Sequence, residues 1–243
     1  ALTVADFNQD GYRDLVATGW SSDVLLFFPG DVRLCLGEPK IIPAEGAPSD
    51  VQAADFDNDS KLDLVTSMYA TGHVALWRGD GTGGFELVDQ FPSRGRLPHK
   101  VRVGDLDRDQ KLDLVVSHCH SDDSLVIFYG IGEFSFPLSQ EILLGEDRQW
   151  VEHEIRDILL EDLNGDDRLD IAAACFASGQ VVALINESED GQTRQTFRRE
   201  TYKFEKAGGK PRAICAADFN QDRKKDLAVA LWNPNSLSLL LAK

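Results

Sequence analysis

The sequence DFNQDGYRDL, which runs from Asp6 to Leu15, decides the fold of this chain because it recurs along the whole length. Further copies read DFDNDSKLDL from Asp55, DLDRDQKLDL from Asp105, DLNGDDRLDI from Asp162 and DFNQDRKKDL from Asp218. The first aspartates of successive copies are 49, 50, 57 and 56 residues apart. Self-similarity at such a period is typical of propellers and solenoids. A repeat array can run to 243 residues as one body, so the length does not require two domains.

Short apolar runs flank each copy of the acidic motif. Residues 2–5 precede the first copy, and residues 15–17 and 24–28 follow it. Such runs, rich in Val, Ile and Leu and separated by Gly, Asp, Ser and Asn, predict strands. A weaker fourth run, such as Phe85 to Val88, closes each of the first four copies. Four short antiparallel strands per repeat predict an all-β fold, a β-propeller built of four-stranded antiparallel blades.

The motif D-x-[DN]-x-D-x-x-x-D-[LI], present five times in one register, also carries a family resemblance. Together with the GDGTGGF stretch at Gly79 to Phe85, it resembles the FG-GAP/VCBS repeat. Integrin α-subunit head domains and many secreted bacterial proteins contain this repeat. The resemblance covers essentially the whole chain and implies a propeller with calcium in its acidic loops.

The sequence does not decide whether the five repeats close into a ring by themselves. We expect a single propeller domain over residues 1–243, with repeats that begin near residues 1, 50, 100, 154 and 211. The fifth repeat stops after its third predicted strand, and an unpaired sheet edge invites pairing. Members of the family it resembles are most often seven-bladed. Two arrangements are therefore open, a five-bladed ring with irregular closure or part of a seven-bladed ring from a longer chain, and we favour the second.

Oxygen ligands for calcium stand on alternate residues of each acidic motif. Calcium takes six to eight oxygen ligands, which tight acidic loops supply from side chains and backbone carbonyls. Motif positions 1, 3, 5 and 9 offer side-chain oxygens, and position 7 offers its backbone carbonyl. The predicted ligands are Asp6, Asn8, Asp10, Tyr12 and Asp14; Asp55, Asp57, Asp59, Lys61 and Asp63; Asp105, Asp107, Asp109, Lys111 and Asp113; Asp162, Asn164, Asp166, Arg168 and Asp170; and Asp218, Asn220, Asp222, Lys224 and Asp226. The formal charge of -16 favours a bound cation. The alternative is a set of acidic surface turns that need no metal.

Position 6 of the motif departs from the family pattern. The resemblance implies a glycine there for a sharp turn, and only Gly11 provides it. The other copies carry Ser60, Gln110, Asp167 and Arg223. Because Gln and Arg adopt a left-handed backbone poorly, we expect the first loop to bind calcium best and the third and fifth loops to bind it more weakly.

The turns after the second strand of each repeat form a second candidate site. Hairpin loops alternate between the two ends of a blade, so these turns lie opposite the acidic loops. The predicted ligand-binding residues in them are Trp20, Tyr69, His120, Phe176 and Trp232. Aromatic residues beside short polar ones suit sugars or protein side chains, and the resemblance implies the same ligand face as in integrins. The alternative is aromatic packing between blades.

The segment of residues 118–120 and the four cysteines are best explained by packing rather than by a binding site. His118 and His120 flank Cys119 and fall on one face of a strand. A transition-metal site there is possible in principle, but no further ligands are indicated, so we favour packing. The four cysteines, Cys35, Cys119, Cys175 and Cys215, follow no zinc or disulfide spacing. We expect all of them to be buried free thiols in strands.

Composition narrows the choice of partners. With 41 acidic and 25 basic residues, the chain repels nucleic acid and anionic membranes, and it has no apolar run of about 18 residues that could enter a membrane. No nucleophile elbow, phosphate loop or zinc motif is present, so we expect no enzyme. We predict a non-catalytic, calcium-stabilised recognition module for a protein or carbohydrate, located outside the cell, in the periplasm or on the cell surface. The alternatives are an architectural subunit of a larger extracellular or surface assembly and, with less support, a polysaccharide-acting enzyme.

Overall fold

The computed structural model describes residues 1–33, 35–119, 124–144, 154–189, 192, 194–204, 208–233 and 235–242. Within them the chain forms antiparallel sheets and a single short 3-10 turn at Trp20–Ser22. The first sheet contains β1 (Leu2–Ala5), β2 (Asp14–Gly19), β3 (Val24–Phe28) and β4 (Lys40–Pro43). The second contains β5 (Pro48–Ala54), β6 (Asp63–Met68), β7 (His73–Gly79) and β8 (Phe85–Pro92). The third contains β9 (Pro98–Gly104), β10 (Asp113–His118), β11 (Ser124–Tyr129) and β12 (Leu138–Leu143).

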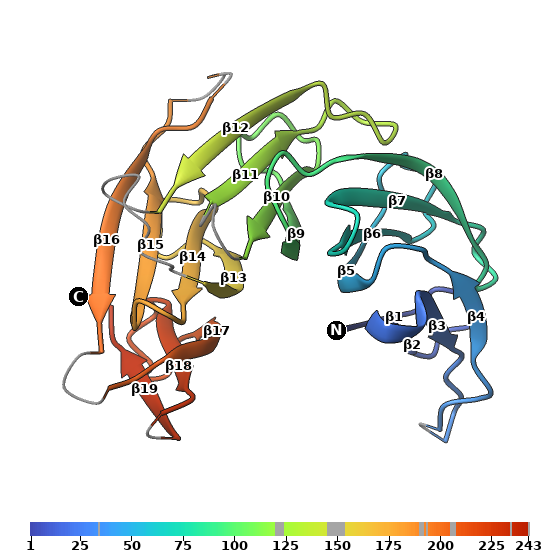
Figure 1. Ribbon diagram of the computed structural model, residues 1–243, viewed down its shortest axis with the longest axis horizontal. Helices are drawn as coiled ribbons and strands as arrows, with labels where there is room; N and C mark the ends of the chain where they lie inside the picture. Colours follow the sequence, from blue (N-terminus) through green and yellow to red (C-terminus); the bar gives the residue numbers. More distant parts are fainter. Residues whose placement is uncertain are drawn as a thin grey trace.

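The remaining two sheets complete the array. The fourth contains β13 (Ile155–Glu161), β14 (Asp170–Cys175), β15 (Gln180–Asn186) and β16 (Phe197–Lys203), and the fifth contains β17 (Pro211–Ala217), β18 (Asp226–Leu231) and β19 (Ser236–Leu240). Strands within each sheet pair in chain order. Figure 1 shows the sheets fanned around a central opening, with the first strand of each sheet nearest the centre. The all-β fold and the blades predicted from the repeat are confirmed, and we refer to these sheets as blades one to five.

The hydrophobic core lies between the blades rather than within any one of them. Each neighbouring pair of blades encloses its own cluster of buried apolar side chains. Phe7, the second residue of the first acidic motif, packs between blades one and two with its ring 5.6 Å from that of Phe85 in blade two. Phe56 occupies the same place between blades two and three, 5.8 Å from Phe134. The motif therefore anchors each blade to the next, because burying a large apolar side chain contributes about 1.5–3 kcal/mol.

The arc of blades is open. In Figure 1, β1 and β17 lie on opposite sides of the gap, so the described residues do not form a closed five-bladed ring. The faces that border the gap are apolar: Leu237 and Phe219 on blade five are 77% and 45% exposed, and Leu2 on blade one is 60% exposed. Phe7, the counterpart of Phe219, is 2% exposed. The terminal faces thus repeat the pattern of the interfaces between blades without a neighbouring blade to cover them.

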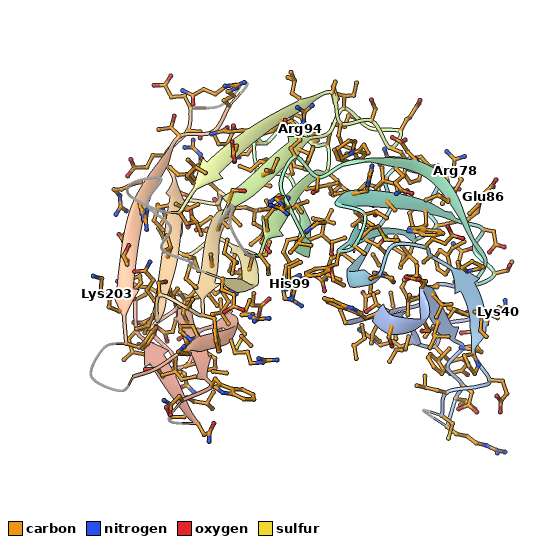
Figure 2. All side chains as sticks on the ribbon, in the orientation of Figure 1. Lys40, Arg78, Glu86, Arg94, His99 and Lys203 are labelled. Atoms are coloured by element: carbon orange, nitrogen blue, oxygen red, sulfur yellow. The ribbon has the colours of Figure 1, made fainter. Side chains whose placement is uncertain are left out.

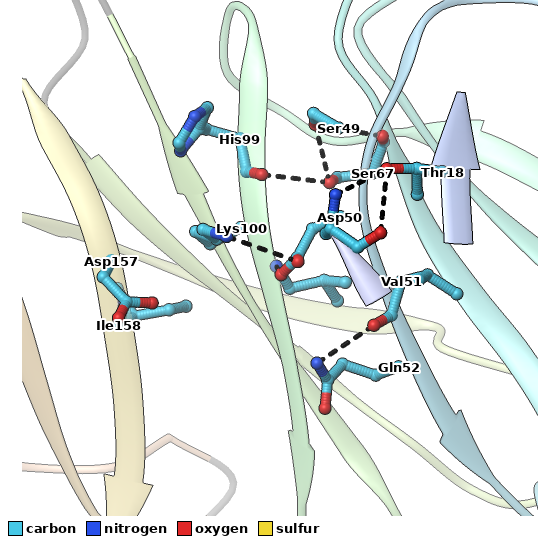
Figure 3. Close-up of polar contacts among 12 residues, drawn as sticks. Thr18, Ser49, Asp50, Val51, Gln52, Ser67, His99, Lys100, Asp157 and Ile158 are labelled. Atoms are coloured by element: carbon cyan, nitrogen blue, oxygen red, sulfur yellow. Dashed lines mark hydrogen bonds and ion pairs between the residues drawn. The ribbon is translucent and has the colours of Figure 1, made fainter. Parts of the chain in front are cut away.

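A polar network joins the inner strands of blades two, three and four. Arg102 on β9 donates to Asp50 on β5 and to Asp157 on β13, each at 2.8 Å. The carboxylate of Asp50 also accepts the backbone N–H of Val101 and lies 3.4 Å from the Nζ of Lys100. Figure 3 shows Lys100 and Asp50 joined across the strands, with Asp157 facing them. The network holds three consecutive blades at a fixed spacing.

The cysteines differ from the expectation in part. Cys119 and Cys175 are buried free thiols, as predicted, whereas Cys35 and Cys215 are exposed. Cys35 lies in the loop between β3 and β4, outside any strand, and Cys215 lies on the face of blade five that borders the gap. No helix in the described part of the chain is long and apolar enough to cross a membrane.

Candidate functional site

The acidic motifs form the turns between the first and second strands of the blades, so all of them lie at one end of the array. Within each turn the carboxylate of the first aspartate accepts hydrogen bonds from two backbone N–H groups. Asp6 accepts the N–H of Asp10 at 3.1 Å and the N–H of Gly11 at 2.9 Å. The same two bonds recur at Asp55, Asp105, Asp162 and Asp218. The five turns therefore share one backbone conformation.

That conformation needs two residues with a left-handed backbone, at motif positions 4 and 6. Position 6 has φ of +87° at Gly11, but also +68° at Gln110 and +70° at Arg223. The expectation that Gln and Arg would resist this geometry is therefore wrong for the backbone, because the hydrogen bonds of the turn hold them there. Position 4 is left-handed as well, and the fourth turn places its glycine, Gly165, at this position. Sequence reasoning missed position 4, although Gly165 was a signal for it.

The last aspartate of each motif is buried and accepts hydrogen bonds from two backbone N–H groups, and we call it the clamp. Asp14, Asp63, Asp113, Asp170 and Asp226 are all 0% exposed. In the second blade, Asp63 Oδ2 accepts the N–H of Phe56 at 2.8 Å and Oδ1 accepts the N–H of Gly79 at 2.9 Å. A Cβ on Gly79 would lie 2.1 Å from the carbonyl oxygen of Leu62, so this close approach admits only glycine. The clamp ties the acidic turn to the end of the third strand, and the equivalent bonds occur in every blade.

Burial raises the pKa of three of these clamps. Loss of solvation is the largest cause, opposed by the two backbone N–H donors and reinforced by the neighbouring aspartates. The pKa rises from 3.8 to about 6 in Asp63 and Asp170 and to about 7 in Asp113. A cation within these turns would relieve the repulsion that contributes to the shift.

The turns differ in how closely their carboxylates gather. Oxygens of Asp55, Asp57 and Asp63 lie within 4.8 Å of one another, and so do those of Asp105, Asp107 and Asp109. In the first, fourth and fifth turns position 3 is an asparagine, and its amide donates to the position-5 aspartate, as Asn8 does to Asp10 at 2.9 Å. The second and third turns therefore carry the denser negative charge.

Cations already neutralise part of the second turn. Lys61 Nζ lies 2.8 Å from Asp59, and Arg78 Nε lies 2.9 Å from Asp57. The hydrogen bond from Lys61 is the main cause that lowers the pKa of Asp59. In the third turn, by contrast, loss of solvation and then the charge of Asp109 raise the pKa of Asp107. The third turn is thus the best candidate for a metal ion on electrostatic grounds.

The position-7 residues were predicted to offer backbone carbonyls. Their N–H groups all donate to the position-5 aspartate, as Tyr12 does to Asp10 at 2.8 Å, and the corresponding donors are Lys61, Lys111, Arg168 and Lys224. These bonds fix the peptide group between positions 6 and 7 alike in the five turns. The position-7 carbonyl belongs to the following peptide group, so its role as a ligand stays a prediction.

The predicted aromatic residues lie at the opposite end of the blades. Trp20 and Trp232 are 46% and 58% exposed. Trp20 packs on Tyr69 of the next blade with 4.4 Å between ring centroids, so this pair serves inter-blade packing as well as the surface. Phe176 is partly buried, and His120 lies outside the described residues.

Cationic side chains accompany these aromatic rings. The guanidinium of Arg212 lies 5.0 Å from the centroid of the Trp232 ring. Arg156 and Lys210 lie 5.4 Å and 5.1 Å from the centroid of Phe176. Sequence reasoning missed these cations, although Arg156 and Arg212 occupy the same register at the start of successive inner strands.

His118 is explained by packing. Its ring is 0% exposed, and Nε2 lies 3.1 Å from the hydroxyl of Ser93. A Cβ on Gly95 would come within 2.5 Å of the ring. Cys119 is buried beside it, with its thiol 3.3 Å from the carbonyl of Ile155. The packing interpretation favoured from the sequence therefore holds for these two residues.

Comparisons with known proteins agree with this architecture. Two solved structures superpose on almost all of the chain. One, a protein from Lactobacillus plantarum, has a TM-score of 0.62 and 15% identity over 99% of this chain and 66% of its own. The other, the Vibrio cholerae biofilm matrix protein Bap1, has a TM-score of 0.55 and 16% identity over 98% of this chain and 36% of its own. At these identities the likeness concerns the fold alone, and the chain spans only part of either protein.

The family comparison is more specific. A search of curated proteins found no match. The model of the FG-GAP-like repeat, however, matches residues 6–66, 65–116 and 162–229, which together make up more than half of the chain. Each matched stretch contains at least one acidic turn and its buried clamp. The chain belongs to the FG-GAP-like repeat family.

Proposed function

We propose that this chain is a non-catalytic recognition module in which calcium stabilises the acidic turns and the opposite face binds a protein or a carbohydrate. The observation that carries the proposal is the separation of the two sets of residues. Every acidic turn lies at one end of the blades, while Trp20 and Trp232 remain 46% and 58% exposed at the other. Exposed tryptophans at a shared register are typical of binding surfaces.

The calcium part of the proposal rests on the oxygen-rich turns. Hard oxygen ligands in a tight loop suit calcium better than softer metals. An ion that binds only the folded protein stabilises it by about 3 kcal/mol when its free concentration is a hundredfold above the dissociation constant. We therefore expect a higher melting temperature in millimolar calcium than in excess chelator. Identical melting curves in the two conditions would rule out calcium as a stabiliser.

The binding part is tested at Trp20. A screen of glycans and candidate proteins would first identify a bound partner for the calcium-loaded chain. Trp20→Ala should then weaken that binding while the melting temperature barely changes. Trp77→Ala is the matched control, because Trp77 is 4% exposed in the core and its truncation should cost about 3–5 kcal/mol of stability. If Trp20→Ala destabilises the fold as much as Trp77→Ala, the residue serves packing alone.

The calcium requirement also bears on location. Loops of extracellular modules commonly bind calcium with dissociation constants of about 0.1–1 mM, which would leave them empty in the cytosol. We therefore place the module outside the cell, in the periplasm or on the cell surface. Bap1, which shares the fold, is described as a biofilm matrix protein. Submicromolar calcium affinity in most turns would argue against this location.

The uncovered apolar faces favour a second candidate function. Leu237 and Leu239 on blade five and Leu2 on blade one are more than half exposed, which suits a subunit built into a larger assembly. An architectural subunit would show assembly through these faces without any ligand at Trp20. The screen described above separates the two functions.

A further inference from the structure

A cleft of about 390 Å³ lies where the inner strands of blades three, four and five begin. It is lined by His99, Lys100, Arg156, Asp157, Arg212, Ala213 and Ala230. Because β9, β13 and β17 all run from this end toward the acidic turns, the cleft is at the face opposite those turns. Figure 2 labels His99 at the central opening. The volume falls in the range of small-ligand sites, about 300–1,000 Å³.

The cleft is cationic, although the chain as a whole has a formal charge of -16. Its one lining carboxylate, Asp157, is already used: Oδ1 accepts from Arg102 at 2.8 Å, and Oδ2 accepts the N–H of Ile214 at 3.1 Å. No carboxylate among the described residues pairs with Arg212 or with the neighbouring Lys210. Within the described residues the charges of Arg212 and Lys210 are therefore unpaired, whereas Lys100 pairs with Asp50 and Arg156 with Glu154.

Two aromatic rings contact the cations of this cleft, although neither ring is among its lining residues. Arg212 stacks over Trp232, with its guanidinium 5.0 Å from the ring centroid. Arg156 and Lys210 both lie within 5.4 Å of the centroid of the Phe176 ring. Stacking holds a guanidinium in place while its N–H edge stays open to a carboxylate or sulfate. The exposed indole beside it offers a flat apolar surface.

Two nitrogen atoms of the lining residues have no hydrogen-bond partner among the described residues. They are the Nδ1 of His99 and the Nε of Arg156, both buried. Arg156 does pair with Glu154 through its terminal nitrogen. Burial first, and then the charges of Lys100 and Arg156, lower the pKa of His99 to about 4, so its ring is neutral at pH 7. Buried polar atoms without a partner are uncommon in folded proteins, and each calls for an explanation; here the two nitrogen atoms add hydrogen-bonding capacity to the wall of the cleft.

We propose that this cleft binds an acidic glycan, whose sugar rings carry carboxylate or sulfate groups. The acid group would lie against Arg212 and Arg156, and the C–H face of a sugar ring would lie on Trp232. An acidic peptide would satisfy the cations but has no comparable rigid C–H face for the indole. This inference rests on the proposed function and deepens it by naming the ligand class.

The test uses the calcium-loaded chain and defined oligosaccharides. The probes are a hyaluronan octasaccharide, its carboxyl-reduced counterpart, a heparin octasaccharide and an octaglutamate peptide, each titrated by calorimetry in millimolar calcium. We expect at least one acidic sugar to bind, with an affinity that falls as salt rises. For the hyaluronan pair, carboxyl reduction should lower affinity about tenfold, because the neutral alcohol no longer makes a charge-assisted hydrogen bond to a guanidinium.

Matched variants assign the binding to the cleft. Arg212→Gln should weaken binding of the acidic sugar about tenfold, the ratio that corresponds to 1.4 kcal/mol. Lys40→Gln makes the same charge change on β4, at the outer edge of blade one in Figure 2, and should leave affinity within about twofold. Arg212 is exposed, so equal melting temperatures are expected and would show that both variants fold.

The remaining outcomes separate this inference from the proposed function. If the carboxyl-reduced sugar binds as well as hyaluronan, charge recognition is refuted while carbohydrate binding stands. Tighter binding of octaglutamate than of either acidic sugar would assign the cleft to an acidic protein segment and overturn the glycan. If no acidic sugar binds, the inference falls, and the proposed function then depends on whether another partner shows the sensitivity to Trp20→Ala described above.

Discussion

At the scale of single residues, the buried aspartate at the end of each motif has the largest energetic consequence. Asp113 is 0% exposed, and both of its oxygens accept backbone N–H groups. Its ionised form is nonetheless disfavoured, because burial removes water and nearby carboxylates repel it. A carboxyl whose pKa is higher in the folded protein than in the unfolded chain contributes stability that is lost as pH rises through the folded pKa.

This sign gives a pH prediction for the calcium-free chain. In chelator, the melting temperature should rise as pH falls from 8 to about 6, because these carboxylates bind protons at a higher pH in the folded protein than in the unfolded chain. Asp113, with a pKa of about 7, is protonated before Asp63 and Asp170, whose pKa is about 6. Below about 6.5 the lowered pKa of His99 works in the opposite direction and should flatten the rise. Calcium should abolish the rise by holding the carboxylates ionised. Calorimetry at several pH values checks this, and a melting temperature that falls on going from pH 8 to 6 in chelator would contradict it.

The turns themselves should differ in calcium affinity. The sequence favoured the first turn because of Gly11, but Gln110 and Arg223 adopt the same left-handed backbone, with φ of +68° and +70°. Charge then becomes the distinguishing property, and affinity in such loops rises with the number of charged ligands. We now expect Asp109→Asn in the third turn to remove a tighter site than Asp222→Asn in the fifth. Calcium titration calorimetry on the two variants measures which turn binds calcium more tightly. Loss of a tighter site with Asp222→Asn would show that backbone geometry, rather than charge, sets the affinity.

At the scale of elements, the inner strands are held together by ion pairs as well as by apolar packing. Arg102 connects Asp50 and Asp157, whose side chains are 3% and 14% exposed. Removal of Arg102 would leave Asp157 without an ion-pair partner among the described residues and Asp50 with Lys100 alone, at 3.4 Å. A buried pair is costly to break from one side because the remaining charge is uncompensated.

We therefore expect Arg102→Met to lower the free energy of unfolding by about 3 kcal/mol. Arg198→Met is the control: Arg198 pairs with Glu187 and Glu200 on the outer surface, where its side chain is 49% exposed. Loss of that surface pair should cost less than about 1 kcal/mol. Urea unfolding of the two variants measures the difference, and equal losses would show that the inner network is no stronger than a surface pair.

Repetition explains which elements the sequence could predict. The acidic turns and their flanking strands recur five times, so the strands and blades could be derived from one motif, whereas the role of its oxygen atoms as ligands stays a prediction. Arg102 could not, because its register holds Gln52, Leu159 and Cys215 in other blades. The cationic cleft could not be predicted for a related reason. It forms where the first residues of the inner strands of three blades lie side by side, and no local sequence pattern indicates that these residues are neighbours. The backbone of Gln110 was misjudged because a network of hydrogen bonds overrides the preference of one residue.

At the scale of the whole molecule, the open arc leaves two apolar sheet faces without a cover. Leu2 on blade one is 60% exposed, whereas its register counterparts Val51 and Val101 are 0% exposed. On blade five, Leu237 is 77% exposed and its counterpart Val181 is 0% exposed. Contiguous apolar surface of this kind promotes association.

We expect the chain, prepared by itself, to self-associate with rising concentration through these faces. The double substitution Leu237→Lys and Leu239→Lys should shift sedimentation toward the monomer. Leu138→Lys is the control, because Leu138 is 53% exposed on the outer strand β12, away from the gap. If the control reduces association as much as the double variant, general charge rather than the terminal face is responsible.

In the chain prepared by itself, the three-stranded fifth blade also sets the order in which the blades unfold. In an array where each unit contacts only its neighbours, unfolding proceeds from the least supported end. β19 is largely exposed, whereas the equivalent strand β15 is buried throughout. Amide protons of β18 and β19 should therefore exchange with solvent before those of β10 and β14, in openings that leave the central blades intact. In the chain prepared by itself, local unfolding of blade five would reach Arg212 and Trp232 first, so the edge of the cationic cleft would be able to adjust to a ligand while blades two to four stay folded.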